Sequence, residues 1–546
     1  MKNTNTLLSI TNLKKYFPVA KASIFQKEQF YVRANEEITI DIQKGETFGL
    51  VGESGCGKST LGRTILQLYD QTAGSTLYYG RTLEELAPAY VANTLTKAPK
   101  MIAEYHKMQA KADKLTAACD DAGDKADFFM HQQKNLAVAE AQTAFQNIVK
   151  ILGGFMALPN CSEGAALLLK KFRTNASIAK IREQIRDLDG EVAFQEAIAK
   201  EFEQDDSIKN GEKKAAAARK KAASYGPKKE KLQQQLRALE KVLAEDMSKL
   251  NALKAKYAGD AKFQEYEAML DYGIDLSRLR YNEMRLLRKD IQIIFQDPYS
   301  SLNPRMTIGQ IIGEGLTTHK FFKPRDPQMK EYILDVMAQC GLQGYMMHRY
   351  PHQFSGGQRQ RICIARALAV KPKFIVCDEC VSALDVSIQS QIINLLQELK
   401  EKEQLTYMFI SHDLSVVRYI SDRICVMYLG NVVELADAAT IFDDPRHPYT
   451  VALLSSIPTT DPDSGDKERI ILEGNIPSPI KPPAGCKFHT RCYMACEKCK
   501  RVPPELREVE PGHFLACHFP EKKLAEDGSY LFELPKMERK SNRDQD

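Results

Sequence analysis

A glycine-rich loop near the start of the chain combines residue types and spacing that could bind a phosphate chain. Residues 52–60 read Gly-Glu-Ser-Gly-Cys-Gly-Lys-Ser-Thr and fit the pattern G-x-x-x-x-G-K-[ST] at every fixed position. Glycines let the backbone curl until successive N–H groups point inward at phosphate oxygens. We therefore predict a nucleotide site made of Gly52, Glu53, Ser54, Gly55, Cys56, Gly57, Lys58, Ser59 and Thr60.

The residues on either side of this loop support a phosphate site. The apolar run 46–51 predicts a strand before the loop, and the spacing of Leu61, Ile65 and Leu66 predicts a helix after it. A helix that begins at Lys58 would add its positive N-terminal end. Lys58 would then be a mobile cation for the β- and γ-phosphates, and the Ser59 hydroxyl would be a ligand of Mg²⁺.

Two adjacent carboxylates form a second candidate site. The apolar run 374–377 ends in Asp378 and Glu379. A buried parallel strand has this pattern, with its acids at the carboxyl end, where ligands bind. Asp378 would hold Mg²⁺ through water, and Glu379 would polarise the attacking water as general base. Such a run is common by itself, but together with the loop it predicts ATP hydrolysis.

A third stretch, residues 354–361, reads Phe-Ser-Gly-Gly-Gln-Arg-Gln-Arg and resembles the signature sequence of ABC ATPases. The resemblance makes Gln296 the Q-loop glutamine, which also binds Mg²⁺, and His412 the switch histidine. It places Asp385 in the D-loop. In that family the signature forms a second anion cradle, which closes on ATP bound to the opposite subunit, so hydrolysis requires a dimer. The cradle here would be Ser355, Gly356, Gly357 and Gln358.

The same resemblance implies an aromatic ring that stacks on the adenine. Tyr16 stands where the family places that ring, and Phe17 is the alternative. Stacking of a base on an aromatic ring would contribute about 1–3 kcal/mol. Either ring could instead simply pack in the interior.

Four longer stretches narrow the resemblance to the ATPase subunits of oligopeptide/dipeptide importers, F-type rather than D-type. They are residues 14–18, 295–304, 381–387 and 447–454. This implies a second ATPase subunit, two transmembrane permeases, an extracytoplasmic peptide-binding protein and a place on the cytoplasmic face of the membrane. Another solute, such as nickel, is the alternative cargo. One departure is Cys380, where many relatives have proline.

Five of the thirteen cysteines lie close together near the end of the chain. Four of them follow the spacing C-x5-C-x6-C-x17-C: Cys486, Cys492, Cys499 and Cys517. This resembles the C-terminal extension of the peptide-importer ATPases, whose cysteines can hold an iron–sulfur cluster. Four thiolates suit [4Fe–4S] or Zn²⁺, and we favour the cluster, with free thiols as the third possibility. Cys496 could replace Cys499.

The elements that must position these residues fall into four zones. We expect a P-loop α/β core with an antiparallel β subdomain and a helical signature subdomain, built from residues 1–86 and 272–458. Residues 87–271 are rich in Ala, Lys, Glu and Gln and predict an inserted all-helical domain. Its apolar stripe 232–257 is narrow enough for a coiled-coil seam. Residues 459–546 would be a small cysteine-bearing extension.

Charge and hydropathy limit the other classes. The net charge of +5 is small for 546 residues and does not indicate nucleic-acid binding. No run approaches the ~18 apolar residues of a membrane span, and residues 1–6 lack a signal-peptide core. We therefore expect a cytoplasmic protein that reaches the membrane through partners. The basic run 213–231 predicts a solvated helix face, with contact to anionic lipid as the alternative. A DNA-tethering ATPase with a coiled-coil arm is the rival class, but this stripe is too short for such an arm.

Overall fold

The chain folds as two units, one built from its two ends and the other from its middle. The computed structural model describes residues 5–21, 28–123, 126–204, 210–322, 327–457 and 470–519. The first unit comprises Met1–Thr76 and Met284–Asp546, and the second comprises Leu77–Glu283. The second unit contains the expected insertion 87–271 and extends beyond it on both sides.

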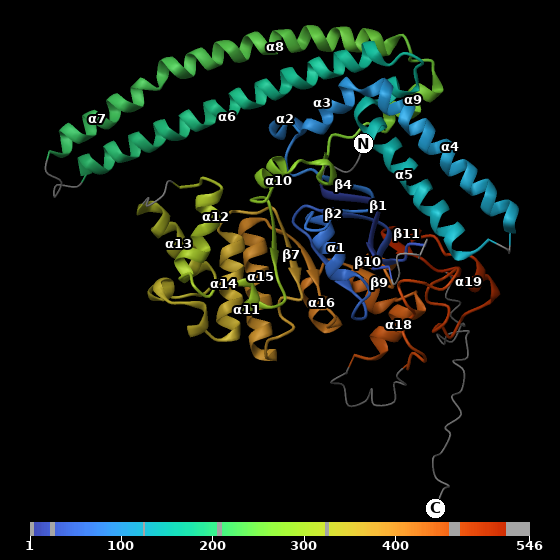
Figure 1. Cartoon of the computed structure of the whole chain (residues 1–546). Coiled ribbons are helices and arrows are strands. Elements are labelled where there is room, and N and C mark those ends of the chain that lie inside the picture. Colours follow the sequence, from blue (N-terminus) through green and yellow to red (C-terminus); the bar gives the residue numbers. More distant parts are fainter. Residues whose placement is uncertain are drawn as a thin grey trace, which may run out of the picture. The chain divides into compact units, whose positions relative to one another are not determined.

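An eight-stranded sheet forms the centre of the first unit (Figure 1). Its middle strands are parallel: β3 pairs with β8 and β9, and β7 pairs with β6 and β8. Every residue of β3, β7 and β8 is buried, as expected for parallel strands that are covered on both faces. In spatial order the strands are β11 (Arg507–Glu510), β12 (His513–Leu515), β10 (Asn431–Asp437), β9 (Arg423–Tyr428), β3 (Thr47–Val51), β8 (Thr406–Ile410), β7 (Phe374–Asp378) and β6 (Ile291–Ile294).

A second, antiparallel sheet begins with the two long strands β1 (Thr6–Pro18) and β2 (Tyr31–Gln43). Strand β4 (Ala73–Tyr78) is the next neighbour of β1. The last two residues of β4 belong to the second unit, where they pair with β5 (Ile274–Asp275).

Helices of the first unit pack on the large sheet and share one hydrophobic core with it. That core includes Ile294, Phe354, Phe409 and Tyr449, and it extends to Phe488 in the C-terminal zone. The C-terminal residues are therefore part of the same fold, and β11 and β12 lengthen its sheet. The helices are α1 (Lys58–Ile65), α10 (Tyr281–Leu287, which begins in the second unit), α11 (Pro298–Ser301), α12 (Ile308–Thr318), α13 (Pro327–Gln339), α14 (Gly356–Leu368), α15 (Val386–Glu403), α16 (Leu414–Ile420), α17 (Ala438–Asp443), α18 (Pro448–Ser455) and α19 (Glu497–Arg501), with 3-10 turns at Gly344–His348 and Pro351–Gln353.

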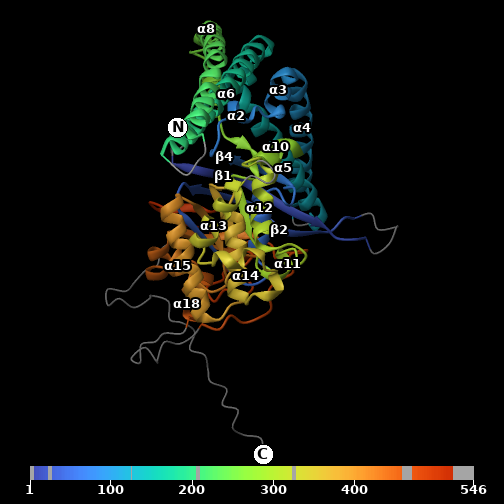
Figure 2. The same ribbon diagram turned by 90° about the vertical axis from the view of Figure 1, so that its left-hand side faces the viewer.

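The second unit consists mainly of long helices. The 43-residue α6 runs beside α7 and α8, and α4 runs beside α5 (Figures 1 and 2). Because β5 and the end of β4 also belong to this unit, it is not entirely helical. Its helices are α2 (Leu83–Leu86), α3 (Ala89–Thr96), α4 (Ala98–Ala122), α5 (Phe128–Leu152), α6 (Ser162–Gln204), α7 (Gly211–Ser224), α8 (Gly226–Ala255) and α9 (Ala261–Ala268), with 3-10 turns at Gly153–Ala157 and Leu276–Arg278.

The apolar stripe 232–257 lies on α8, and α6 supplies its partner with Ile178 and Leu188 buried. The basic run 213–231 lies on α7 and the start of α8. Two of its cations pair with acids of α6, Arg219 with Glu203 and Lys229 with Asp189. None of the described helices is both long and apolar enough to cross a membrane.

Candidate nucleotide site

The predicted phosphate loop joins β3 to α1, and α1 begins at Lys58 as expected. Two of its glycines could not be replaced without a clash. Gly57 has a φ of 101°, and a Cβ there would lie 2.1 Å from the Ala34 carbonyl oxygen. Gly52 has a φ of 147°, and its Cβ would lie 2.2 Å from the Met427 carbonyl oxygen. The fixed glycines of the motif therefore have a steric cause.

The Lys58 side chain is buried and folds back over its own loop. Its Nζ donates to the carbonyl oxygens of Gly52, at 2.7 Å, and Glu53, at 3.1 Å. These contacts place the ammonium group inside the curl of the loop. A cation held there can bind phosphate oxygens of a nucleotide that enters the loop.

A cavity of about 430 Å³ opens over this loop. Two side chains far along the sequence, Gln296 and Glu379, reach its wall together with the loop. The predicted residues are thus brought to one place by the strand ends of the sheet. The cavity is lined by Phe17, Val32, Arg33, Ala34, Ser54, Gly55, Gly57, Lys58, Ser59, Thr60, Gln296, Glu379, Leu429, Gly430 and Pro479.

Two of the predicted catalytic side chains lie against the same carboxylate oxygen of Glu379. Gln296 Nε2 donates to Oε2 at 2.9 Å, and His412 Nδ1 lies 3.5 Å from the same oxygen. The Glu379 backbone has a φ of 49°, and its N–H donates to the Ile410 carbonyl oxygen at 3.1 Å. This strained turn directs the carboxylate off the end of β7, where it could polarise a water molecule.

Asp378 is buried and forms an ion pair that the sequence did not indicate. Arg63, on α1, donates to its Oδ2 from Nη2 at 3.0 Å and from Nε at 3.3 Å. In the described part of the chain, no hydrogen-bond partner reaches the other oxygen, Oδ1, although it is buried. A buried carboxylate oxygen without a partner among the described residues fits the expected role of Asp378, which is to hold Mg²⁺ through water. The only signal in the sequence was that Arg63 follows the loop on the same predicted helix.

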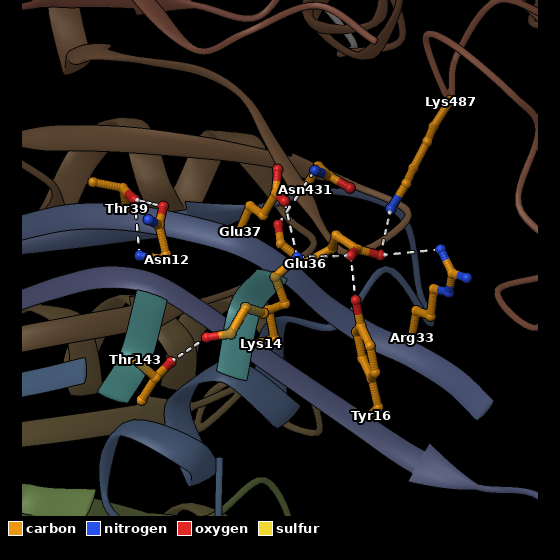
Figure 3. A network of polar contacts seen from close by, with 11 residues as sticks. Asn12, Lys14, Tyr16, Arg33, Glu36, Glu37, Thr39, Thr143, Asn431 and Lys487 are labelled. Carbon is orange, nitrogen blue, oxygen red and sulfur yellow. Dashed lines mark hydrogen bonds and ion pairs between the residues drawn. The ribbon is translucent and has the colours of Figure 1, made fainter. Parts of the chain in front are cut away.

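Tyr16 does not take the place expected for the adenine ring partner. Its ring is buried, and its hydroxyl donates to Glu36 (Figure 3). Phe17, the alternative, lines the cavity instead. Successive residues of a strand point to opposite faces, so the two rings of β1 cannot share one environment. This placement favours Phe17, the alternative, over Tyr16 as the ring that could stack on adenine.

The signature residues lie outside this cavity. Ser355 is exposed and caps α14: its hydroxyl accepts from the Gln358 N–H at 3.4 Å, while Gln358 Oε1 accepts from the Ser355 N–H at 3.1 Å. Gly356 and Gly357 form the first turn of that helix, and Asp385 caps α15. A helix start of this kind can bind an anion, and this one lies apart from the cavity over the phosphate loop.

The four C-terminal cysteines lie near one another. Burial raises the pKa of Cys486 to about 11 and that of Cys492 to about 12, and the thiols of Cys499 and Cys517 add to both shifts. Nevertheless, the described residues contain no group of three or more His, Cys, Asp or Glu side chains arranged to hold a metal ion. The arrangement therefore gives the expected cluster no support, and the cluster stays a prediction from the spacing of the cysteines.

Two family models match the sequence. The model described as "ABC transporter" matches residues 35–268 and 257–382, and "Oligopeptide/dipeptide transporter, C-terminal region" matches residues 433–499. The oligopeptide transport ATP-binding protein AppF of Bacillus subtilis is 54% identical over 248 residues, which are 45% of this chain and 75% of that protein. The OppF protein of Haemophilus influenzae is 50% identical over 45% of this chain and 74% of its own length. The dimeric structure of a bacterial ABC transporter cassette gives a TM-score of 0.39 at 15% identity, covering 79% of this chain and 99% of its own.

Proposed function

This chain belongs to the ABC transporter family of ATPases, and from that premise we propose that it powers an importer of oligopeptides or dipeptides. The match of residues 433–499 to the C-terminal region of oligopeptide/dipeptide transporters supports a peptide cargo over nickel. The names of its relatives support the same cargo. A DNA-tethering role has no such support.

One observation carries the ATPase assignment: the phosphate loop, Gln296 and Glu379 line a single cavity. Lys58 would bind the β- and γ-phosphates, because its amine is held inside the loop. Ser59, Gln296 and Asp378 would hold Mg²⁺, which neutralises charge on the phosphates when it is bound. Glu379 would polarise the attacking water. His412, which lies against the same carboxylate oxygen, would stabilise the negative charge of Glu379.

The exposed signature suggests that each cavity is completed by another subunit. Ser355, Gly356 and Gly357 lie at the start of α14 and do not line the cavity of their own chain. In the proposed cycle, ATP joins two ATPase subunits and hydrolysis releases them, because the γ-phosphate contacts exist only in the closed state. The partners would be a second ATPase subunit, two permeases and an extracytoplasmic peptide-binding protein, with this chain on the cytoplasmic face of the membrane.

Two substitutions test the ATPase assignment. Glu379→Gln should bind ATP and accumulate as an ATP-bound dimer, with turnover reduced by about 10²–10⁴-fold. Lys58→Ala should abolish nucleotide binding. Glu401→Gln, an exposed acid on α15, is the matched control and should leave both properties unchanged. Near-normal turnover of Glu379→Gln, or retained ATP affinity of Lys58→Ala, would show that the roles are wrongly assigned.

The cargo is tested by transport into vesicles that contain the complete importer. Uptake of a labelled oligopeptide that depends on ATP and is lost with Glu379→Gln would support the proposal. Uptake of Ni²⁺ without peptide uptake would replace it with the alternative.

An iron–sulfur centre on Cys486, Cys492, Cys499 and Cys517 is a separate proposal that comes from the sequence spacing. Its support is that spacing together with the backbone contact between two of the four cysteines, in which the Cys486 N–H donates to the Cys499 carbonyl oxygen at 2.7 Å. No step of the ATPase cycle depends on it. Iron and sulfide analysis of anaerobically purified protein decides the question, and colourless protein without iron would exclude the cluster.

A further inference from the structure

The C-terminal segment makes a direct ion pair with the phosphate loop. Arg491 donates to both carboxylate oxygens of Glu53, from Nη1 at 2.7 Å and from Nη2 at 3.0 Å. The Arg491 side chain is only 7% exposed and that of Glu53 is 25% exposed. A two-pronged pair of this kind fixes orientation as well as distance, because the guanidinium is planar and rigid.

Glu53 in turn holds the part of the loop that holds Lys58. The Lys58 ammonium group donates to the carbonyl oxygens of Gly52 and Glu53, which belong to the two peptide groups on either side of the Glu53 Cα. The Glu53 N–H, in the same peptide group as the Gly52 carbonyl, donates to the Tyr449 hydroxyl at 2.8 Å. A shift of the Glu53 backbone would move both acceptors of the lysine, so whatever fixes Glu53 also fixes the phosphate-binding cation.

The position of Arg491 is itself fixed by contacts with Phe488 and Tyr428. Its N–H donates to the Phe488 carbonyl oxygen at 2.9 Å, and its guanidinium lies 5.9 Å from the centre of the Tyr428 ring. The rings of Tyr428, Tyr449 and Phe488 pack edge to face, with centres 4.8–5.3 Å apart. The arginine therefore stands on a rigid aromatic support, and little side-chain entropy is lost when it pairs with Glu53.

The same segment reaches a second wall of the cavity. Lys487 donates to the Leu429 carbonyl oxygen at 3.1 Å and lies 3.8 Å from Glu36, where Arg33 and Tyr16 also converge (Figure 3). Upstream, the Pro479 carbonyl oxygen accepts from the Arg33 N–H at 3.2 Å. Leu429, Arg33 and Pro479 all line the cavity.

We propose that Arg491 is a positioning residue of the nucleotide site, through which the C-terminal segment sets the affinity of the phosphate loop for ATP. This proposal rests on the proposed ATPase function. It assigns the residues from 479 to 491 to the nucleotide site, although they lie more than four hundred positions after the loop. Arg491 does not contact Glu379 or Gln296, so it acts on binding rather than on hydrolysis.

The test measures ATP affinity and steady-state kinetics in the full chain. Arg491→Gln should weaken ATP binding about tenfold, which corresponds to about 1.4 kcal/mol. It should raise KM for ATP by a similar factor while kcat stays within about twofold of the original, because the hydrolytic groups are untouched. Arg491→Lys keeps the positive charge but loses the two-pronged contact with Glu53. Its ATP affinity should lie between those of the original protein and Arg491→Gln.

Glu53→Ala and the double variant complete a cycle that separates positioning from general stability. If the pair acts as proposed, Glu53→Ala weakens ATP binding as Arg491→Gln does, and the double variant adds little to either. Glu53→Ala also serves as the second test should Arg491→Gln fail to fold. Lys500→Gln removes an exposed pair with Glu497 in the same segment and should change nothing.

Three results would overturn the proposal. The first is unchanged ATP affinity in Arg491→Gln, and the second is a double variant whose loss of affinity equals the sum of the two single losses. The third is a variant in which kcat falls in proportion to its lowered melting temperature while KM for ATP stays the same. Lys58→Ala distinguishes this failure from that of the proposed function. Loss of binding in Lys58→Ala with no effect of Arg491→Gln refutes only the inference. Retained binding in Lys58→Ala refutes the proposed nucleotide site as well.

Discussion

The sheet of the first unit and the long helices of the second are packed in different ways. Strands β3, β7 and β8 are buried along their whole length, and they carry large buried side chains such as Phe374 and Phe409. The helices of the second unit instead meet at small residues, for example Ala199 with Ala215 and Ala218. The wide core holds functional side chains at fixed positions. The contact between α6 and α7 is built from small side chains and encloses less interior.

The ion pairs of the two units also differ in what they contact. In the first unit, ion pairs such as Arg63–Asp378 have a fully buried acid and belong to the site. In the second, Arg182–Glu240 and Arg219–Glu203 are exposed at both ends, although Lys170 pairs with the buried Asp246. Exposed pairs are worth only about 0.2–1 kcal/mol. A buried charge, by contrast, is costly without a partner, so its retention points to function.

The largest expected effect is on ATP affinity, from substitutions of glycines in the phosphate loop. Gly57→Ala places a Cβ against the Ala34 carbonyl oxygen at a positive φ, so the loop must move. We expect ATP affinity to fall about a hundredfold or more, which corresponds to about 2.8 kcal/mol. Gly55 also has a positive φ, of 80°, but a Cβ there would meet nothing within 4 Å. Gly55→Ala should therefore lower ATP affinity less, through backbone strain alone. Equal affinity of Gly57→Ala and wild type, in titrations with a fluorescent ATP analogue, would refute the steric role of this glycine.

Core truncations should separate the two kinds of packing. Phe409→Ala removes a fully buried ring from the first unit and should cost about 3–5 kcal/mol. Leu236→Ala removes a half-buried side chain from α8 and should cost about 1 kcal/mol or less. Hydrogen exchange followed by mass spectrometry reads each unit separately, since a protein of two units need not unfold in one step. Similar costs at both positions would mean that the helical unit has a tighter core than its packing suggests.

Acid should act on the two units with opposite signs. Burial lowers the pKa of His447, in the first unit, from 6.5 to about 4. The unfolded chain therefore binds more protons between pH 6.5 and 4, and the first unit loses up to about 3 kcal/mol as the pH falls through this range.

Burial raises the pKa of Asp275, in the second unit, above its ordinary 3.8. As the pH falls towards 4 the native state takes up this proton first, so the second unit gains stability. Hydrogen exchange at pH 7 and pH 5, corrected for intrinsic rates, should show loss of protection in the first unit only. His447→Gln should remove most of that loss, and an unchanged pH response would show that another group causes it.

The smallest expected effect is a gain. Gly190 lies on the exposed side of α6 at an ordinary helical φ, and a Cβ there meets nothing within 4 Å. Gly190→Ala should stabilise the second unit by roughly 0.5–1 kcal/mol, because alanine loses less backbone entropy in a helix. ATP affinity should not change. A loss of protection in α6 would indicate that this glycine has a function that its surroundings do not reveal.

The motifs of the first unit could be assigned from the sequence because each is short and its geometry is local. The loop 52–60 needs only its own glycines and the helix that follows, and the start of α1 at Lys58 agrees with that expectation. The strand that ends in Asp378 was likewise predicted from its apolar run, and it is buried and parallel as expected.

What failed or was missed depended on contacts between distant residues. Which of Tyr16 and Phe17 faces the cavity is decided by the register of β1 against β2, and neither ring type fixes that register. Arg63 and Arg491 carry no motif, and their acids Asp378 and Glu53 lie 315 and 438 positions away. Local patterns determined the phosphate loop, the carboxylates and the helices of the middle zone. Only the tertiary structure decided which side chains hold them in place, because a buried charge selects its partner by proximity in space, and the sequence does not record that proximity.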